Sequence, residues 1–318
     1  MPTKEHLIDC YRKMLVIRNF EIRVEDLFSK GMIMGTAHTC IGQEAVAVGA
    51  SSALRKKDYV TSNHRGHGHF IARGGDPGRM MAELFGKVEG YSGGRGGSQL
   101  MADYSLGFIG GNGITGGSIP VATGIALSAQ LKKNRRIAAC FFGDGAANQG
   151  AFHESLNMAG LWRLPVIYIC ENNLYAMSTP VQRSTAVCNI ADRAVCYGIK
   201  GRSVDGNDFF AVRDAVLEAR KRALASGGPT LLECRTYRLS GHSRGDPRRY
   251  RTRDEEKKAW VKEPIRRFRR YLVGQGIITR EHDRRIVGEA RKTISDAVRF
   301  AREGNDPDPA VLEKGVFA

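Results

Sequence analysis

An aspartate and an asparagine follow two apolar segments of this chain, at a spacing that indicates a shared ligand site. Asp144 lies in a Gly-Asp-Gly motif directly after the apolar run 137–142, and Asn173 is the second residue of an Asn-Asn pair after the run 165–171. The 26 residues between the two motifs include 150–163, where apolar residues recur near helical spacing. The pattern predicts strand, helix, strand, with parallel strands because the crossover is long.

This arrangement would bring both side chains to the carboxyl edge of a parallel sheet, where open α/β sheets bind ligands. The oxygens of the Asp144 carboxylate, the Asn173 amide and a nearby backbone carbonyl form a hard site that suits Mg²⁺. Small residues at Gly145 and Ala146 leave room for a diphosphate beside the backbone. Taken alone, the Gly-Asp-Gly motif could be an ordinary turn with a capping aspartate, but the second motif favours a ligand site.

The rest of the chain alternates between predicted strands and helices, as in a doubly wound, mostly parallel α/β fold. Helices are expected over 3–30, 42–54, 118–131 and 208–226, strands over 58–61 and 230–237, and a helix followed by a strand over 192–204. Two polar helices, broken near the Gly-Gln-Gly at 274–276, are expected over 254–303. These elements predict a main domain over 1–253, beginning with a helix, and a helical C-terminal extension over 254–318 packed on it.

Residues 90–117 contain eleven glycines, far above the usual frequency of about 7%, so loop backbone shaped around a ligand is expected. Residues 111–116 match the GxGxxG motif of dinucleotide-binding folds. However, no strand is predicted before this motif, and residue 136, twenty positions past Gly116, is arginine rather than an acid. The alternative hypothesis of an NAD-binding dehydrogenase therefore depends on this motif alone.

The charge of the chain raises a second alternative, a basic nucleic-acid-binding module. The net charge is +16, and residues 235–318 hold 22 Lys and Arg against 13 Asp and Glu. No nucleic-acid-binding motif accompanies this excess, so solvated helix faces and docking to an acidic protein are the preferred explanation. Apolar runs are too short for a membrane span. The start lacks a signal-like segment, and seven cysteines without a CxxC pair indicate reduced thiols and a cytoplasmic protein.

The segment 141–180 resembles the α subunit of the first component of pyruvate and acetoin dehydrogenases; it reads FFGDGAANQGAFHESLNMAGLWRLPVIYICENNLYAMSTP. Gly-Asp-Gly followed after 26 residues by Asn-Asn resembles the thiamine diphosphate signature, and the resemblance extends from about Leu7 to Val316. It implies a thiamine-diphosphate-binding fold, Mg²⁺, and cleavage of pyruvate or acetoin with transfer of the two-carbon unit to lipoamide on an acyltransferase. Branched-chain 2-oxo acids are the alternative substrates.

The resemblance assigns roles to named residues. It implies Mg²⁺ ligands at Asp144, Asn173 and the backbone carbonyl of Tyr175. It implies cofactor contacts at His64, Arg65, Ser105, Gly113, Thr115, Gly145, Ala146 and His242, with Gly113 and Thr115 holding the aminopyrimidine ring through their backbone.

Histidines are the candidates for proton transfer, because an imidazole exchanges protons near neutrality. The resemblance places His38 near the substrate, and His242 near the cofactor and the acyl-transfer site, beside a serine, Ser243, that is phosphorylated in some members. At position 64, histidine resembles acetoin-type members, since pyruvate-type members usually carry tyrosine. His67 and His69 form a poor zinc pattern with it and are expected to be structural.

The resemblance also implies a partner. The glutamate that activates the cofactor belongs to the β subunit in this family, and Glu44, the one nearby candidate to replace it, is expected to be structural. The chain is also short for both thiamine-diphosphate-binding domains. We therefore expect an α2β2 heterotetramer with active sites at α/β interfaces.

Overall fold

A six-stranded parallel sheet, in the order β2-β1-β3-β4-β8-β7, forms the centre of the computed structural model, which describes residues 2–243 and 245–311. Its strands are β1 (Tyr59–Thr61), β2 (Phe108–Gly110), β3 (Ala138–Gly143), β4 (Val166–Asn172), β7 (Lys200–Asp205) and β8 (Thr230–Arg235). A short antiparallel hairpin, β5 (Tyr175–Ala176) and β6 (Thr179–Pro180), follows β4. The predicted α/β fold is confirmed.

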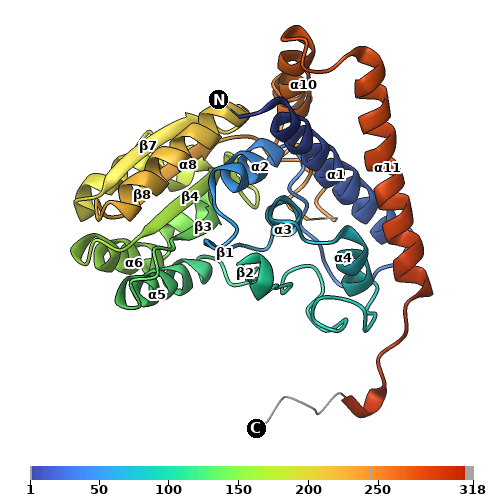
Figure 1. The fold of residues 1–318 in the computed structure, drawn as a ribbon, viewed down its shortest axis with the longest axis horizontal. Helices are drawn as coiled ribbons and strands as arrows, with labels where there is room; N and C mark the ends of the chain where they lie inside the picture. The colour runs from blue at the N-terminus through green and yellow to red at the C-terminus, as the bar shows by residue number, and fades with distance from the viewer. Residues whose placement is uncertain (1, 244, 312–318) are drawn as a thin grey trace.

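Helices cover both faces of this sheet (Figure 1). The α-helices are α1 (Lys4–Ser29), α2 (Glu44–Ala53), α3 (His67–Arg73), α4 (Pro77–Leu84), α5 (Ser118–Leu131), α6 (Gly150–Leu161), α7 (Val181–Ser184), α8 (Phe209–Leu224), α9 (Arg253–Val261), α10 (Pro264–Gly274) and α11 (Arg280–Glu303). Short 3₁₀ helices are η1 (Tyr104–Leu106), η2 (Asp144–Asn148), η3 (Ile190–Tyr197) and η4 (Pro309–Val311). The predicted strand–helix–strand unit is therefore β3, α6 and β4.

Alternate residues of β3 belong to two separate apolar cores. Ala138, Cys140 and Phe142 pack in the core formed with α5 and α6, whereas Ala139 and Phe141 pack in the core formed with α1, α2 and α8. This period of two is expected of a strand that is buried on both faces. Burial on both faces fixes the orientation of β3, and therefore the position of Asp144, which directly follows it.

The sheet order reverses between β1 and β3. From β1 the chain crosses to β2 at one edge and then returns to β3 on the other side of β1. Connections that leave in opposite directions open a crevice at the carboxyl ends of the two strands. His64 and Arg65 follow β1, and Asp144 follows β3. The fold thus places these predicted site residues at one crevice.

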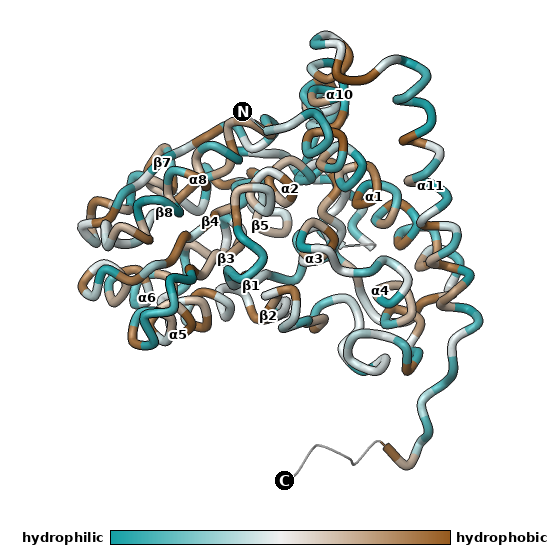
Figure 2. The backbone as a smooth tube through the Cα atoms, in the orientation of Figure 1, coloured by the Kyte–Doolittle hydropathy of each residue, from teal (hydrophilic) through white to brown (hydrophobic). Residues whose placement is uncertain are grey.

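The C-terminal region contains three helices, so the prediction of two was wrong. The additional break falls before α10, where the Glu263 carboxylate accepts hydrogen bonds from the backbone N–H groups of Ile265 and Arg266, and Pro264 occupies the first turn. The long α11 lies along α1 and α4 (Figure 1). Hydrophilic and hydrophobic residues alternate along it (Figure 2), as expected of a helix with one packed face. The domain boundary after residue 253 stays a prediction.

All seven cysteines are free thiols, five of them buried. Among the helices of the described residues, none has the length and apolar character needed to cross a membrane.

Candidate active site

A cavity of about 290 Å³ lies at the carboxyl ends of β1, β3 and β4. Nine of the twelve predicted site residues line it: His64, Arg65, Thr115, Asp144, Gly145, Ala146, Asn173, Tyr175 and His242. A larger and more open groove, about 750 Å³, lies between β7 and α9, but it shares only Tyr175 with this set. The smaller cavity is therefore the candidate active site.

Asp144 is the chemically unusual residue of this cavity. It is 2% exposed, and its Oδ2 atom has no hydrogen-bond partner among the residues that the structure describes. Burial raises the pKa of the Asp144 carboxyl to about 6, while backbone N–H groups, including that of Asn173, and the charges of Arg238 and Arg65 act in the opposite direction. Buried carboxylate oxygens are normally paired, so this one is available to a cation.

Asn172 and Asn173 have different roles. The Asn172 amide donates to Glu233 Oε1 (2.7 Å) and its oxygen accepts from the Leu174 backbone N–H (3.1 Å), so it joins β4 to β8 and shapes the following turn. Asn173 lines the cavity, and its Nδ2 donates to Gln43 Oε1 (2.9 Å). Of the two asparagines, only Asn173 thus lines the cavity.

The backbone carbonyl of Tyr175, the predicted third metal ligand, already accepts a hydrogen bond. Arg238 donates from Nη1 to this carbonyl (3.2 Å) and from Nη2 to the carbonyl of Met177 (2.9 Å). Burial lowers the pKa of the Arg238 guanidinium. A carbonyl oxygen has two lone pairs, so the Tyr175 oxygen keeps one for a cation while Arg238 places a positive charge on the cavity wall.

Gly145 lets the backbone form part of the wall. A Cβ atom at Gly145 would lie 2.7 Å from the Cβ of Ala176, inside van der Waals contact. Any side chain there would displace the β5–β6 hairpin. The glycine is therefore required by packing, and it leaves the peptide groups of 144–146 accessible to a ligand.

Three histidines gather at the cavity. The ring centroids of His38 and His64 are 4.8 Å apart, those of His38 and His242 are 4.9 Å apart, and those of His64 and His242 are 5.8 Å apart. Arg65 donates from Nη2 to His242 Nδ1 (3.1 Å) and to the His242 carbonyl (2.9 Å). The Gln99 amide nitrogen lies 3.2 Å from His38 Nδ1. Because a guanidinium can only donate, the ring proton of His242 lies on Nε2, and the Gln99 amide N–H favours the same tautomer for His38.

Burial, followed by the positive charge of Arg65, lowers the pKa of each imidazole: to about 4 for His38, about 2 for His64 and about 3 for His242. All three are therefore neutral at pH 7. Burial and the charge of Arg238 in turn lower the pKa of Arg65 to about 9. Within the described part of the chain, no group of three or more His, Cys, Asp or Glu side chains is placed to hold a metal ion.

Three predicted residues lie outside the cavity lining. His38 reaches the site only through its ring contacts with the other two histidines. Ser105 is exposed, and its hydroxyl donates to the carboxylate of Asp103 (2.6 Å), the residue that caps η1. Gly113 is exposed and outside the lining, although Thr115, two positions later, belongs to it.

The glycine-rich segment also corrects an expectation. A strand, β2, does precede the GxGxxG motif at 111–116, and α5 follows it. The strand has only three residues and pairs with β1 at the sheet edge. Thr115 and Gly116 line the cavity that contains Asp144, so the motif contributes to that site.

The other acids and histidines near the cavity are held in pairs. The His67 ring binds Glu21 (Nδ1 to Oε2, 2.9 Å), and the His69 ring binds Glu171 (Nε2 to Oε1, 3.2 Å). The Glu44 carboxylate pairs with an arginine of α1 at 2.6 Å. None of these carboxylates is left unpaired.

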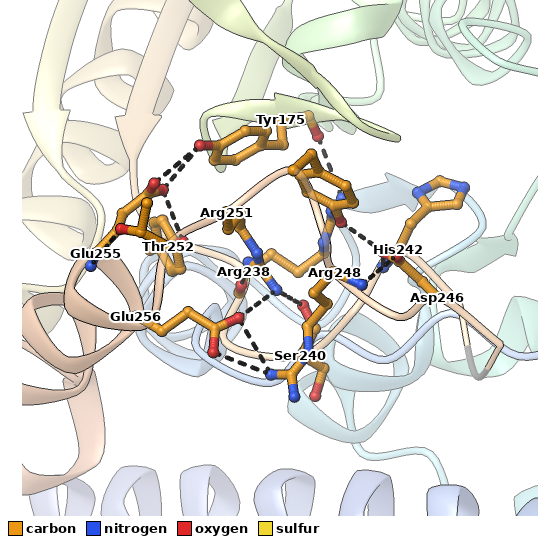
Figure 3. A network of polar contacts seen from close by, with 12 residues as sticks. Tyr175, Arg238, Ser240, His242, Asp246, Arg248, Arg251, Thr252, Glu255 and Glu256 are labelled. Atoms are coloured by element: carbon orange, nitrogen blue, oxygen red, sulfur yellow. Dashed lines mark hydrogen bonds and ion pairs between the residues drawn. The ribbon is translucent and has the colours of Figure 1, made fainter.

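A polar network holds the loop that carries His242 (Figure 3). The Asp246 carboxylate accepts from the His242 backbone N–H (2.6 Å) and from the Tyr250 hydroxyl, which also accepts from Arg238 Nη2 (2.6 Å). Buried Arg251 donates to the carbonyls of Arg238 and, at 2.8 Å, Ser240. Ser243 lies on the same loop and is half-buried. The network fixes His242 beside Arg65.

Comparison with known proteins identifies the family. A family model described as the dehydrogenase E1 component matches residues 12–310, a range that contains every predicted site residue. The chain belongs to the dehydrogenase E1 component family. E1 components depend on thiamine diphosphate, which agrees with the resemblance noted in the two spaced motifs.

Both acetoin and pyruvate dehydrogenase α subunits are among the curated relatives of this E1 chain. It is 44% identical to the α subunit of acetoin:2,6-dichlorophenolindophenol oxidoreductase from Bacillus subtilis, over 99% of this chain and 94% of that protein. It is 43% identical to the pyruvate dehydrogenase E1 component subunit α of Rhizobium meliloti (98% and 89%), and 42% identical to that of Zymomonas mobilis (96% and 86%). The acetoin-type and pyruvate-type relatives have nearly the same sequence identity to this chain, so identity favours neither substrate.

Several residues of the E1 cavity were absent from the sequence prediction. They include Gln43, Asn63, Gln149, Glu171 and Arg238. Most of them lie beside predicted residues. Gln43 directly precedes Glu44, Asn63 directly precedes His64, and Glu171 directly precedes the Asn-Asn pair, whereas Arg238 lies four positions before His242. Their position next to predicted site residues is the sequence feature that could have identified them.

Proposed function

We propose that this chain is the α subunit of a Mg²⁺- and thiamine-diphosphate-dependent E1 enzyme that acts on acetoin or pyruvate. The observation that carries the proposal is the buried, unpaired Oδ2 of Asp144 in the cavity that it shares with Asn173. A bound cation stabilises a buried, unpaired carboxylate more than one that is already paired. One carboxylate and one amide suit a hard ion whose other ligands are phosphate oxygens.

The remaining cavity residues fit the same cofactor. Asp144, Asn173 and the carbonyl of Tyr175 would hold Mg²⁺. The diphosphate would be bound by His64, Arg65 and the backbone at 145–146, with Arg238 as an additional cation that the sequence did not indicate. When bound, thiamine diphosphate supplies an electron sink for the fragment left by carbon–carbon cleavage.

Proton transfer would involve the neutral histidines. Arg65 and Gln99 occupy the Nδ1 atoms of His242 and His38, so each ring offers an Nε2–H as donor. His38 would hydrogen-bond the substrate oxygen, and His242 would assist transfer of the two-carbon unit to lipoamide on an acyltransferase partner. Arg65 thus has two functions, because it binds phosphate and fixes the His242 tautomer.

Acetoin and pyruvate are the leading substrates because the curated relatives carry both names at nearly equal identity. Histidine at position 64, where pyruvate-type members usually have tyrosine, supports acetoin. Branched-chain 2-oxo acids rank third.

The cavity also requires a partner. Among the described residues that line it, only Asp144 and Glu171 are acidic, and Glu171 accepts hydrogen bonds from Gln43 and His69. No carboxylate of this lining is therefore left to activate the aminopyrimidine ring. We propose that a β subunit supplies it within an α2β2 heterotetramer.

An exposed apolar surface offers a place for that subunit. On α5, Val121 and Leu131 are 45% and 74% exposed, and on the adjacent α6 Leu161 is 74% exposed. Space for a Cβ atom is open at Gly124, on the same side of α5. Large exposed apolar groups clustered on two packed helices are typical of a subunit interface.

The test is dye reduction by the chain co-expressed with its β subunit. With Mg²⁺ and thiamine diphosphate, we expect turnover of acetoin or pyruvate, little turnover of branched-chain 2-oxo acids, and none after the metal is chelated. The isolated chain should be inactive. Absence of turnover with every substrate, or full activity of the isolated chain, would refute the proposal.

A further inference from the structure

We infer that Gln43 is a positioning residue for the metal site: it orients the Asn173 amide so that the oxygen, not the nitrogen, is presented to the cation. This inference rests on the proposed function, in which Asn173 is a metal ligand. An asparagine amide can be rotated by half a turn with almost no change in shape. The rotation would replace a ligand oxygen by an NH₂ group, which cannot bind a metal ion.

The orientation starts from Glu171, whose buried carboxylate offers only acceptors. The amide of Asn63 is fixed independently, because its oxygen accepts from the Arg65 backbone N–H (2.7 Å), and its Nδ2 therefore faces Glu171 Oε2 (3.5 Å). His69 Nε2 lies 3.2 Å from Glu171 Oε1. Glu171 is thus held in place by groups outside the metal site.

Gln43 transmits this orientation. Its Nε2 donates to Glu171 Oε1 (3.3 Å), which leaves its Oε1 facing Asn173. That oxygen accepts from Asn173 Nδ2 at 2.9 Å. With its nitrogen held, Asn173 must turn Oδ1 the other way, where its one hydrogen bond from a described residue is the long one from the Tyr175 backbone N–H (3.3 Å).

Burial makes the arrangement depend on Gln43. Gln43 and Glu171 are each 1% exposed and Asn173 is 5% exposed. Water therefore cannot easily replace a lost amide partner. Groups that orient metal ligands in this way typically change metal affinity by about 10- to 100-fold when removed.

A purely structural role for Gln43 is the competing explanation, since it also joins the start of α2 to the end of β4. Replacement of Asn173 by aspartate separates the two roles. A carboxylate presents an oxygen in either orientation, so Gln43 would have nothing left to orient in that background. A structural contribution of Gln43 would be needed equally in both backgrounds.

The experiment is calorimetric titration of Mg²⁺ into the co-expressed α and β subunits with thiamine diphosphate present. Four forms are compared: wild type, Gln43→Met, Asn173→Asp and the double variant. We expect Gln43→Met to weaken Mg²⁺ binding by about 10- to 100-fold in the wild-type background, and by less than about 2-fold in the Asn173→Asp background. The unfolding temperature without cofactor checks that each variant is folded.

Equal losses in the two backgrounds, or no loss in the wild-type background, would overturn the inference. If Asn173→Asp alone binds too weakly to compare, thiamine diphosphate affinity of Gln43→Met is measured at rising Mg²⁺. Recovery to the wild-type value at saturating Mg²⁺ supports the inference, and a persistent deficit overturns it. Wild-type protein that binds thiamine diphosphate without Mg²⁺ would instead refute the proposed metal site, and the inference with it.

Discussion

Replacing Asp144 by asparagine should make the cofactor-free chain more stable while destroying its proposed metal site. Burial raises the pKa of this carboxyl from 3.8 to about 6. Each pKa unit corresponds to about 1.4 kcal/mol, so the buried charge destabilises the folded chain by about 3 kcal/mol at neutral pH. Asp144→Asn removes the charge and keeps the shape. An unfolding entropy of about 2.1 cal/mol/K per residue converts this gain to roughly 4 °C as an upper value.

The sign of the pH dependence follows from the raised pKa. The folded state binds the proton more tightly than the unfolded state, so the destabilisation is full above about pH 6 and disappears as pH falls toward 3.8. The stability gap between wild type and Asp144→Asn should therefore be largest at pH 7 to 8 and close at about pH 4. Thermal unfolding of the purified chain without Mg²⁺ or cofactor, as a function of pH, measures it.

Asp58 provides the matched control. It is as deeply buried as Asp144, but Arg220 pairs with it at 2.7 Å and the Arg55 backbone N–H donates to it at 2.8 Å. Asp58→Asn should therefore destabilise the chain, by about 3–5 kcal/mol, because it breaks a buried ion pair. If Asp144→Asn were destabilising as well, the reasoning that Asp144 is an uncompensated buried charge would be refuted.

Three further predictions follow from the loop network, the neutral histidines and the exposed helices. Tyr250→Phe removes the hydroxyl that joins Arg238 to Asp246, so tryptic cleavage in the loop 238–251 should become several-fold faster; an unchanged rate would contradict the network's role. The pKa of His242, near 3, predicts no change of its NMR ring shifts between pH 5 and 8 in the cofactor-free chain, and titration near pH 6.5 would contradict its burial beside Arg65. Val121→Asp on α5 should abolish co-purification with the β subunit while leaving the unfolding temperature of the isolated chain within about 2 °C; retained assembly would exclude this surface as the interface.

Local sequence was sufficient for the centre of the fold, and together with the family resemblance it indicated nine of the residues that line the cavity. The apolar runs before Asp144 and Asn173 are strands because each is buried on both faces, and the crossover between them forces the strands to be parallel. Such features depend on neighbouring residues, so periodicity and turn residues reveal them. The C-terminal break was missed although Pro264 was visible, because a helical pattern continues on both sides of it.

Contacts that depend on the tertiary fold could not be predicted from the sequence. Gln43 and Asn173 are 130 positions apart, and Arg238 reaches the carbonyl of Tyr175 only because β8 lies beside β4. Ser105 lies outside the cavity lining for a local reason, since its hydroxyl donates to Asp103 in a 3₁₀ turn. Side-chain direction in irregular loops follows from such contacts and not from motif spacing.

The most direct test of the central claim is calorimetric titration of thiamine diphosphate into the α and β subunits co-expressed with wild-type chain or with Asp144→Asn, at pH 7.5, with Mg²⁺ present and after chelation. The account predicts Mg²⁺-dependent binding to wild type and affinity at least about 100-fold weaker for Asp144→Asn, since a metal ligand is lost. Equal affinity of the two proteins, or wild-type binding that persists without a divalent ion, would contradict it.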